Sequence, residues 1–355
     1  MKYLLSVITP SHNPDILQLE RAFNSLKKQT LGFENIEWVI VSHNTIECKT
    51  ASILAMTCSF PNVSVYVLND GIKSAATPRN HGLERAKGFY IGFLDQDDWF
   101  EVDVFEKALK YIKETEADMV SFQFKSVCAD DKVQTVPPNT LLDQTKEIIV
   151  MESESWDSSL FMHIMGLSIW SKVYKKEFLQ KHSLQFDNEV AFFDDALFNI
   201  DCFNKVKRIC FLPNLYGYNY FLHSESTVQN LKKTPNEVKH YTTSLVKTFE
   251  HGLKGNLYMR GVIWGYLCYI ASILLVSKGI TVKERKQVYR LLSPYLKSEK
   301  MPPEYALKSF GNDGKSMVKF PRAVIKNPFL IHIFVYVMKF LRVDIERKLK
   351  EHHKY

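Results

Sequence analysis

The chain has 355 residues, of which 46% are hydrophobic and 24% charged. These proportions are typical of globular proteins and exclude wholesale disorder, and the length predicts two domains or one large domain with an appendage. The net charge of +7 is too dilute to indicate nucleic-acid binding, but it suits anionic ligands such as phosphates, or an anionic membrane surface.

Cysteine spacing and the first apolar stretch indicate the compartment. The six cysteines include no C-x-x-C pair, so neither a zinc site nor a redox motif is indicated and reduced, buried thiols are expected. The run Leu4–Thr9 is too short for a signal-peptide core and lacks a cleavage site. We therefore expect a buried first strand and a cytoplasmic protein.

Short apolar strands alternate with helical patterns over the first 125 residues. Because helices separate the strands, we predict a largely parallel α/β sheet covered on both faces, with a ligand at the carboxyl ends of the strands. Residues 126–150 are expected to be irregular. The predicted strands are Leu4–Thr9, Ile36–Val41, Val63–Leu68, Tyr90–Leu94 and Met119–Phe124, and the predicted helices include Ile16–Leu26, Pro78–Ala86 and Phe105–Ile112.

The strongest chemical signal is Asp95-Gln96-Asp97-Asp98, directly after a predicted strand. Like charges this close repel each other, and a divalent cation would compensate them. Oxygen ligands favour Mg²⁺ or Mn²⁺, which often bridge one or two carboxylates to substrate phosphates. An EF-hand loop is excluded because Phe100 stands where that loop needs glycine. The alternative is a solvated acidic turn that begins the next helix.

Four further segments accompany this acidic turn in a fixed order. The chain opens with Ser6–Asn13, Gly71–Leu83 contains Thr77-Pro78-Arg79-Asn80, and Trp170–Leu179 precedes Phe193–Asn199 with its acidic pair. Together these blocks resemble family 2 glycosyltransferases, which have the GT-A fold, over roughly residues 1–225. The Thr-Pro-Arg-Asn variant is similar to wall teichoic acid glycosyltransferases. No glycine fingerprint of a Rossmann dehydrogenase and no Walker loop is present.

The resemblance implies an inverting transfer of sugar from a nucleotide donor to a hydroxyl of a cell-surface glycan or lipid-linked acceptor. It implies Asp97 as the ligand of Mn²⁺ or Mg²⁺ and Asp195 as the catalytic base. For Asp194 and Asp195, an ordinary helix start is the alternative. The resemblance also implies nucleotide-sugar contacts from Thr9, Pro10, Asn13, Ser42, Arg79, Asn80, Asp95 and Gln96, and diphosphate or acceptor contacts from Asp98, Trp170, Asp194, His223 and Ser226. The alternatives are a surface ion pair for Arg79, packing in the core for Trp170 and an ordinary loop position for His223.

One segment departs from the family pattern. After the second strand the family usually shows Asp-Asp-Gly-Ser, whose acid reads the uracil edge, whereas this chain has Val41-Ser42-His43-Asn44-Thr45. The nucleotide is therefore open, and UDP is expected only because the family commonly uses it. The departure also supports an alternative function, a catalytically silent module that binds a glycan or a partner. The retained acids Asp95, Asp97 and Asp195 argue against that alternative.

From about residue 230 the sequence predicts helices only. We expect residues 1–230 to form the GT-A domain and residues 231–355 a helical region for membrane association or oligomerisation. The stretch Gly261–Ser277 favours a buried helix over a membrane span. The basic end of Pro328–Lys350 favours either an interfacial helix on an anionic membrane or a contact in a homo-oligomer. The predicted helices are Asn236–His251, Tyr258–Ser277, Val282–Leu296 and Pro328–Lys350.

Overall fold

The computed structural model describes residues 3–128, 133–135, 145–153, 168–190, 193–222, 235–252 and 281–296. These residues fall into two units. The first contains the sheet and the helices up to residue 203. The second contains α8 (Pro235–Gly252) and α10 (Val282–Leu296), which pack against each other. The predicted boundary near residue 230 lies outside the described residues and stays a prediction.

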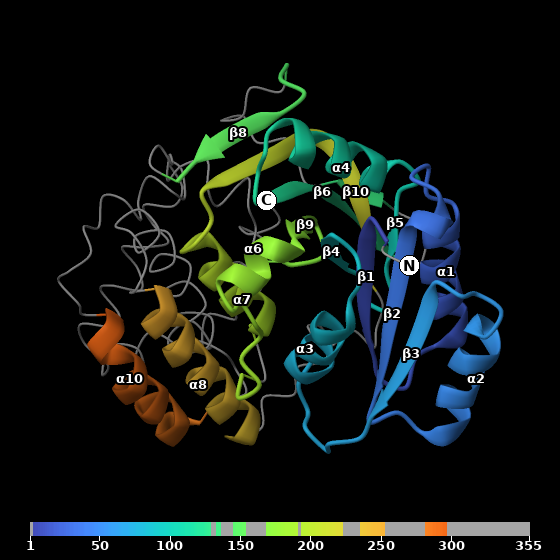
Figure 1. Cartoon of the computed structure of the whole chain (residues 1–355). Coiled ribbons are helices and arrows are strands. Elements are labelled where there is room, and N and C mark those ends of the chain that lie inside the picture. Colours follow the sequence, from blue (N-terminus) through green and yellow to red (C-terminus); the bar gives the residue numbers. More distant parts are fainter. Residues whose placement is uncertain are drawn as a thin grey trace. The chain divides into compact units, whose positions relative to one another are not determined.

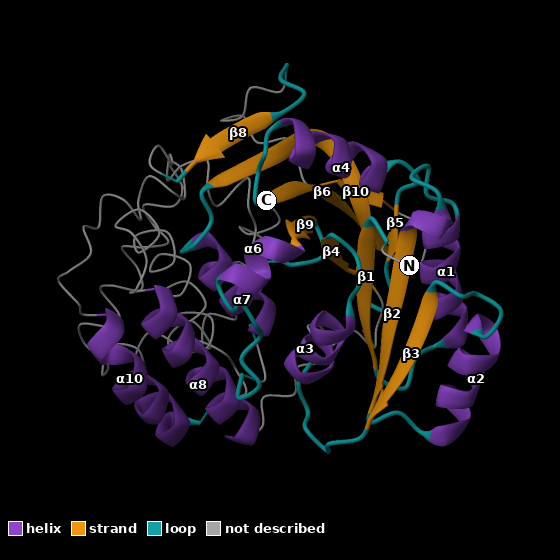
Figure 2. Cartoon of the chain, viewed as in Figure 1, coloured by secondary structure: helices purple, strands orange, loops and turns teal. Residues whose placement is uncertain are grey.

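One sheet organises the first unit (Figures 1 and 2). Its order is β3-β2-β1-β4-β9-β6-β10-β5, with β7 beside β6 and β8 beside β10. The neighbours from β3 to β4 run parallel, whereas β9 is antiparallel to both β4 and β6. The strands are β1 (Leu5–Ser11), β2 (Ile36–His43), β3 (Val63–Leu68), β4 (Tyr90–Phe93), β5 (Trp99–Phe100), β6 (Met119–Cys128), β7 (Val133–Thr135), β8 (Ile149–Glu152), β9 (Lys172–Lys175) and β10 (Arg208–Leu222).

Apolar side chains on both faces of the central strands require cover on both sides. Val7 and Ile8 of β1 are fully buried. Helix α1 (Ile16–Lys27) and α2 (Glu47–Thr57) lie on one face, and α3 (Ala76–Arg85) lies on the other (Figure 1). The remaining helices of this unit are α4 (Val104–Glu114), α6 (Lys176–Lys181) and α7 (Asp194–Phe203). The predicted, mostly parallel α/β class is confirmed.

Three sequence predictions about this unit were wrong or incomplete. Helix α2 was not expected, because it buries only Thr50, Ile53 and Thr57 and therefore shows no apolar stripe. The thiols of Cys48, in this helix, and of Cys58, directly after it, are exposed and not buried. Residues 126–150 are not wholly irregular, since β6 continues to residue 128 and β7 and β8 follow.

The predicted helices Tyr258–Ser277 and Pro328–Lys350 lie outside the described residues. Within the residues that are described, no helix combines the length and the apolar character that a membrane crossing needs. The predicted membrane association, oligomerisation and cytoplasmic location therefore stay predictions.

The strand order reverses between β1 and β4, and the carboxyl ends of these two strands are called the β1–β4 crevice below. From β1 the chain proceeds outward to β2 and β3, and α3 then returns it to β4 on the other side of β1. In open α/β sheets, ligands bind outside the carboxyl ends of the strands at such a reversal. The residues that follow Ser11 and Phe93 therefore flank the expected site.

Close packing of α3 on β1 gives the first prediction. A Cβ added at Gly82 would overlap the side chain of Ile8. Overpacking typically costs about 1–3 kcal/mol, which exceeds the gain of up to about 1 kcal/mol from replacing a helical glycine by alanine. We expect Gly82→Ala to lower the free energy of unfolding in denaturant titrations. Glu84→Ala, at an exposed position of the same helix, is the control, and equal stability of both variants would contradict the prediction.

Candidate functional site

The turn after β4 directs one of its three carboxylates into the protein. Asp98 is fully buried, and its two oxygens accept hydrogen bonds from the Tyr218 hydroxyl and the Phe221 N–H, each at 2.7 Å. Burial raises the pKa of Asp98 well above its ordinary value, and repulsion from Asp97 and Asp95 acts in the same direction. Asp98 therefore anchors the turn to β10.

Two side chains from distant elements fix the backbone of the same turn. The Tyr218 hydroxyl accepts from the Asp95 N–H at 3.2 Å. Arg21 of α1 donates to the Asp97 carbonyl at 2.7 Å, and its guanidinium lies 3.9 Å from the centroid of the Trp99 ring. Asp97 itself is half-buried. The sequence analysis missed both Tyr218 and Arg21, since no local pattern signals a side chain that supports a remote turn.

Arg79 connects the acidic turn to the start of α7. Its Nη1 donates to Asp194 Oδ2 at 2.5 Å and its Nη2 to Asp95 Oδ1 at 3.1 Å. Burial alone would lower the pKa of Arg79, but the carboxylates of Asp194, Asp95 and Asp195 raise it above its ordinary value. The side chain is 8% exposed, so this is a buried bridge and not a surface ion pair.

Asp195 lies half-buried in the first turn of α7. Its Oδ1 accepts from the Ala196 N–H at 2.8 Å. Removal from water raises the pKa of Asp195 to about 7, repulsion from Asp194 adds to this, and the charge of Arg79 opposes it. A carboxylate with a pKa near neutrality is suited to accept a proton.

Gln96 ties the acidic turn to the loop after β1. Its Oε1 accepts from the Ser11 hydroxyl at 3.0 Å and from the His12 N–H at 2.9 Å, and its Nε2 donates to the His12 carbonyl at 3.2 Å. These bonds hold together the two sides of the β1–β4 crevice. A ligand contact from Gln96 stays a prediction.

The other residues predicted to lie near the nucleobase differ in how accessible their side chains are. Thr9 and Ser42 are fully buried; the Thr9 hydroxyl accepts from Trp38 Nε1, and the Ser42 hydroxyl bonds that of Thr50, both at 2.9 Å. A ligand contact from either hydroxyl would therefore compete with an internal bond. Pro10 is half-buried, whereas Asn13 is exposed and its Oδ1 accepts from the Ile46 N–H at 2.9 Å.

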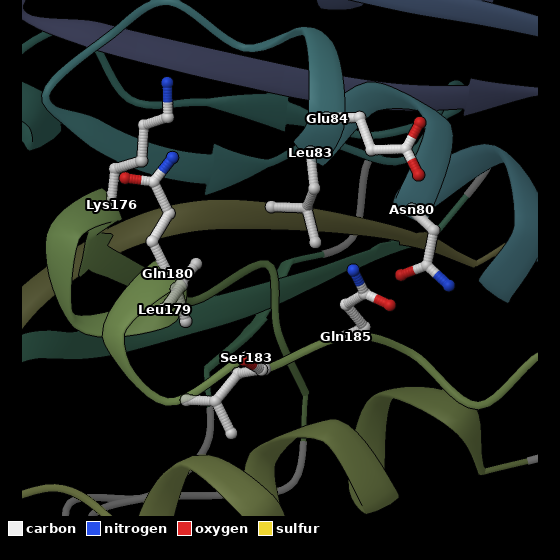
Figure 3. Close-up of a pocket in the computed structure, with 9 residues that line it drawn as sticks. Asn80, Leu83, Glu84, Lys176, Leu179, Gln180, Ser183 and Gln185 are labelled. Carbon is white, nitrogen blue, oxygen red and sulfur yellow. The ribbon is translucent and has the colours of Figure 1, made fainter.

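Asn80 and Trp170 also have internal partners. The Asn80 amide bonds the Phe186 N–H and carbonyl, each at 2.8 Å, next to a cleft of about 330 Å³ between α3 and α6 (Figure 3). Trp170 is half-buried and stacks on Tyr218, with ring centroids 4.5 Å apart. His223 and Ser226 lie outside the described residues.

Comparisons with known proteins point to one family. The pattern of glycosyl transferase family 2 matches residues 6–182. The chain is 26% identical over 218 residues to the uncharacterized glycosyltransferase EpsJ of Bacillus subtilis, covering 61% of the chain and 60% of EpsJ. It is 28% identical over 241 residues to the minor teichoic acid biosynthesis protein GgaB of the same organism, covering 67% of the chain and 25% of GgaB.

The fold is shared with solved structures of Staphylococcus aureus TarS, a poly(ribitol-phosphate) beta-N-acetylglucosaminyltransferase. The TarS 1–349 structure in complex with UDP-GlcNAc superposes with a TM-score of 0.68 at 18% identity, covering 92% of this chain and 90% of that one. The GT-A fold expected from the sequence is therefore confirmed. The chain belongs to glycosyl transferase family 2, among relatives that include an uncharacterized glycosyltransferase, a minor teichoic acid biosynthesis protein and a poly(ribitol-phosphate) beta-N-acetylglucosaminyltransferase.

Proposed function

We propose that this protein transfers a sugar from a nucleotide donor, with UDP as the favoured nucleotide, to a hydroxyl of a cell-surface glycan or lipid-linked acceptor. The observation that carries the proposal is the buried bridge from Arg79 to Asp95 and Asp194. The bridge joins the acidic turn to the start of α7, where Asp194 is followed by Asp195, a carboxylate whose pKa is raised to about 7. The UDP-GlcNAc complex of TarS and the names of the relatives support the donor and acceptor classes.

The acidic turn fits a divalent cation that also binds the donor. Within the described residues, no three His, Cys, Asp or Glu side chains assemble into a metal cage. Mg²⁺ and Mn²⁺ at phosphate sites typically take only one or two carboxylates and complete their shell with substrate phosphates and water. Asp97, with Asp95 beside it, would supply these oxygens, and the bound ion would neutralise charge on the departing diphosphate.

Asp195 is proposed to take the proton of the attacking hydroxyl. Attack on the anomeric carbon from the side opposite to the diphosphate needs one base and inverts the anomeric configuration. A general base contributes on the order of 10²–10⁴-fold to such a step. Arg79 holds Asp194 beside this base, and Asp194 in turn helps to keep the pKa of Asp195 near neutrality.

Replacing the proposed base should separate binding from turnover. We expect Asp195→Asn to lower turnover by on the order of 10²–10⁴-fold, because an amide cannot accept the proton, while UDP binding stays within a few-fold of the wild type. The measurements are sugar transfer or donor hydrolysis with Mn²⁺, and calorimetric titration with UDP. Glu177→Gln, an exposed acid on α6, is the control. Full activity of Asp195→Asn would show that another group is the base, and an inert wild type across the common nucleotide sugars would favour the silent binding module.

The raised pKa of Asp195 predicts the pH dependence. The base works only as the carboxylate, so kcat/KM should rise with pH and level off above about 7. Below that pKa it should fall about tenfold per pH unit. The initial rate at low donor concentration, followed from about pH 5 to about pH 8.5, tests this. A flat profile over this range would contradict the assignment.

The support of the turn can be tested at Tyr218. Tyr218→Phe removes the hydroxyl that joins the Asp95 N–H to the buried Asp98 carboxyl. We expect the free energy of unfolding to fall by about 1–3 kcal/mol and the KM for the donor to rise, because the turn is less well fixed. Tyr66→Phe is the control, since the Tyr66 hydroxyl makes no hydrogen bond within the described residues. Identical stability and KM for both variants would argue against this role.

A further inference from the structure

The loops after β2 and β3 are joined by a network around Asp70. His43, at the end of β2, donates from Nε2 to Asp70 Oδ1 at 2.8 Å. The Ile72 N–H donates to the same oxygen at 2.8 Å and Asn44 Nδ2 at 3.3 Å. One carboxylate oxygen is thus saturated by three donors. The structure gives the other, Oδ2, no hydrogen bond within the described residues.

Asp70 is accessible and charged at this edge of the sheet. Its side chain is 20% exposed, while its partner His43 is 7% exposed. Partial burial favours the neutral carboxyl, but the hydrogen bonds from His43, Ile72 and Asn44 outweigh it and lower the pKa of Asp70. Oδ2 is therefore a charged acceptor held in a fixed direction by the network on Oδ1.

The direction of a bound nucleotide follows from the proposed function, on which this inference rests. The sugar and diphosphate belong near Asp97 and Asp195, on the β4 side of the crevice. The nucleobase must then extend in the opposite direction, past the end of β1 toward the loops after β2 and β3. Of the two carboxylates in the loops after β1, β2 and β3, Asp15 caps α1 by accepting from the Leu17 N–H at 2.9 Å. Asp70 is the other.

We propose that Asp70, oriented by His43, selects the nucleobase by accepting a hydrogen bond from the imide N3–H of uracil. Cytosine presents an acceptor at N3, whose lone pair would face the carboxylate. Adenine likewise presents a ring acceptor, and guanine, which has a ring N–H, is a larger purine. A hydrogen bond to a charged group is worth roughly 10- to 100-fold in affinity. The selectivity of the proposed UDP site would thus come from the loop after β3.

The test compares matched ligands on the full chain by calorimetric titration with Mn²⁺ present. We expect the wild type to bind UDP on the order of 10- to 100-fold more tightly than CDP or N3-methyl-UDP, and more tightly than GDP. Asp70→Asn should reduce both pyrimidine ratios about tenfold, because UDP loses the hydrogen bond to a charged acceptor. The asparagine amide can also donate to the N3 acceptor of CDP, which lowers that ratio further. Asp70→Glu, which keeps a carboxylate, should restore part of the ratio.

Glu47→Gln removes a nearby exposed charge from the first turn of α2 and should leave the ratios unchanged. Wild-type discrimination between UDP and N3-methyl-UDP requires no variant, so the inference remains testable if Asp70→Asn folds poorly. Equal binding of these two ligands, tighter binding of GDP, or unchanged ratios in Asp70→Asn would overturn the inference while leaving the proposed function intact. If the wild type bound none of these nucleotides, the proposed function itself would fail.

Discussion

The positive charge of Arg79 between two carboxylates is the constraint on which the rest of the site depends. Asp95 belongs to the turn after β4, and Asp194 begins α7, 115 residues beyond Arg79. A buried charge that loses its partner costs several kcal/mol, so α3, the acidic turn and α7 must keep their relative positions. The distance between the proposed donor site at Asp97 and the proposed base at Asp195 is thereby set by one guanidinium.

The sheet explains why these elements meet. The chain leaves β1 in one direction and returns to β4 on its other side, so α3, which contributes Arg79, is the helix of that return. Gln96 then bonds the loop after β1 across the reversal. These hydrogen bonds join the acidic turn after β4 to the end of β1.

Local patterns predicted the elements of the site better than their contacts. The strand before Asp95 was recognisable because an apolar run ends in closely spaced charges, whereas the acidic pair at Asp194 was singled out only by the resemblance to the family. The bridge through Arg79, the inward direction of Asp98 and the antiparallel β9 were not, since each depends on residues far apart in the chain. Helix α2 was missed for a different reason, because it is largely exposed and two of its three buried residues are threonines, so its buried face is not an apolar stripe.

Contacts with residues far away in the chain also explain how the acidic turn holds three carboxylates within four positions despite their mutual repulsion. Asp98 is withdrawn from water and takes two hydrogen bonds from β10, and Asp95 is compensated by Arg79. Both are fixed by partners elsewhere in the first unit. Asp97 stands between them with its carbonyl held by Arg21. The contacts that withdraw Asp98 and orient Asp95 come from β10 and α3, so the sequence of the turn alone does not show how its three carboxylates differ.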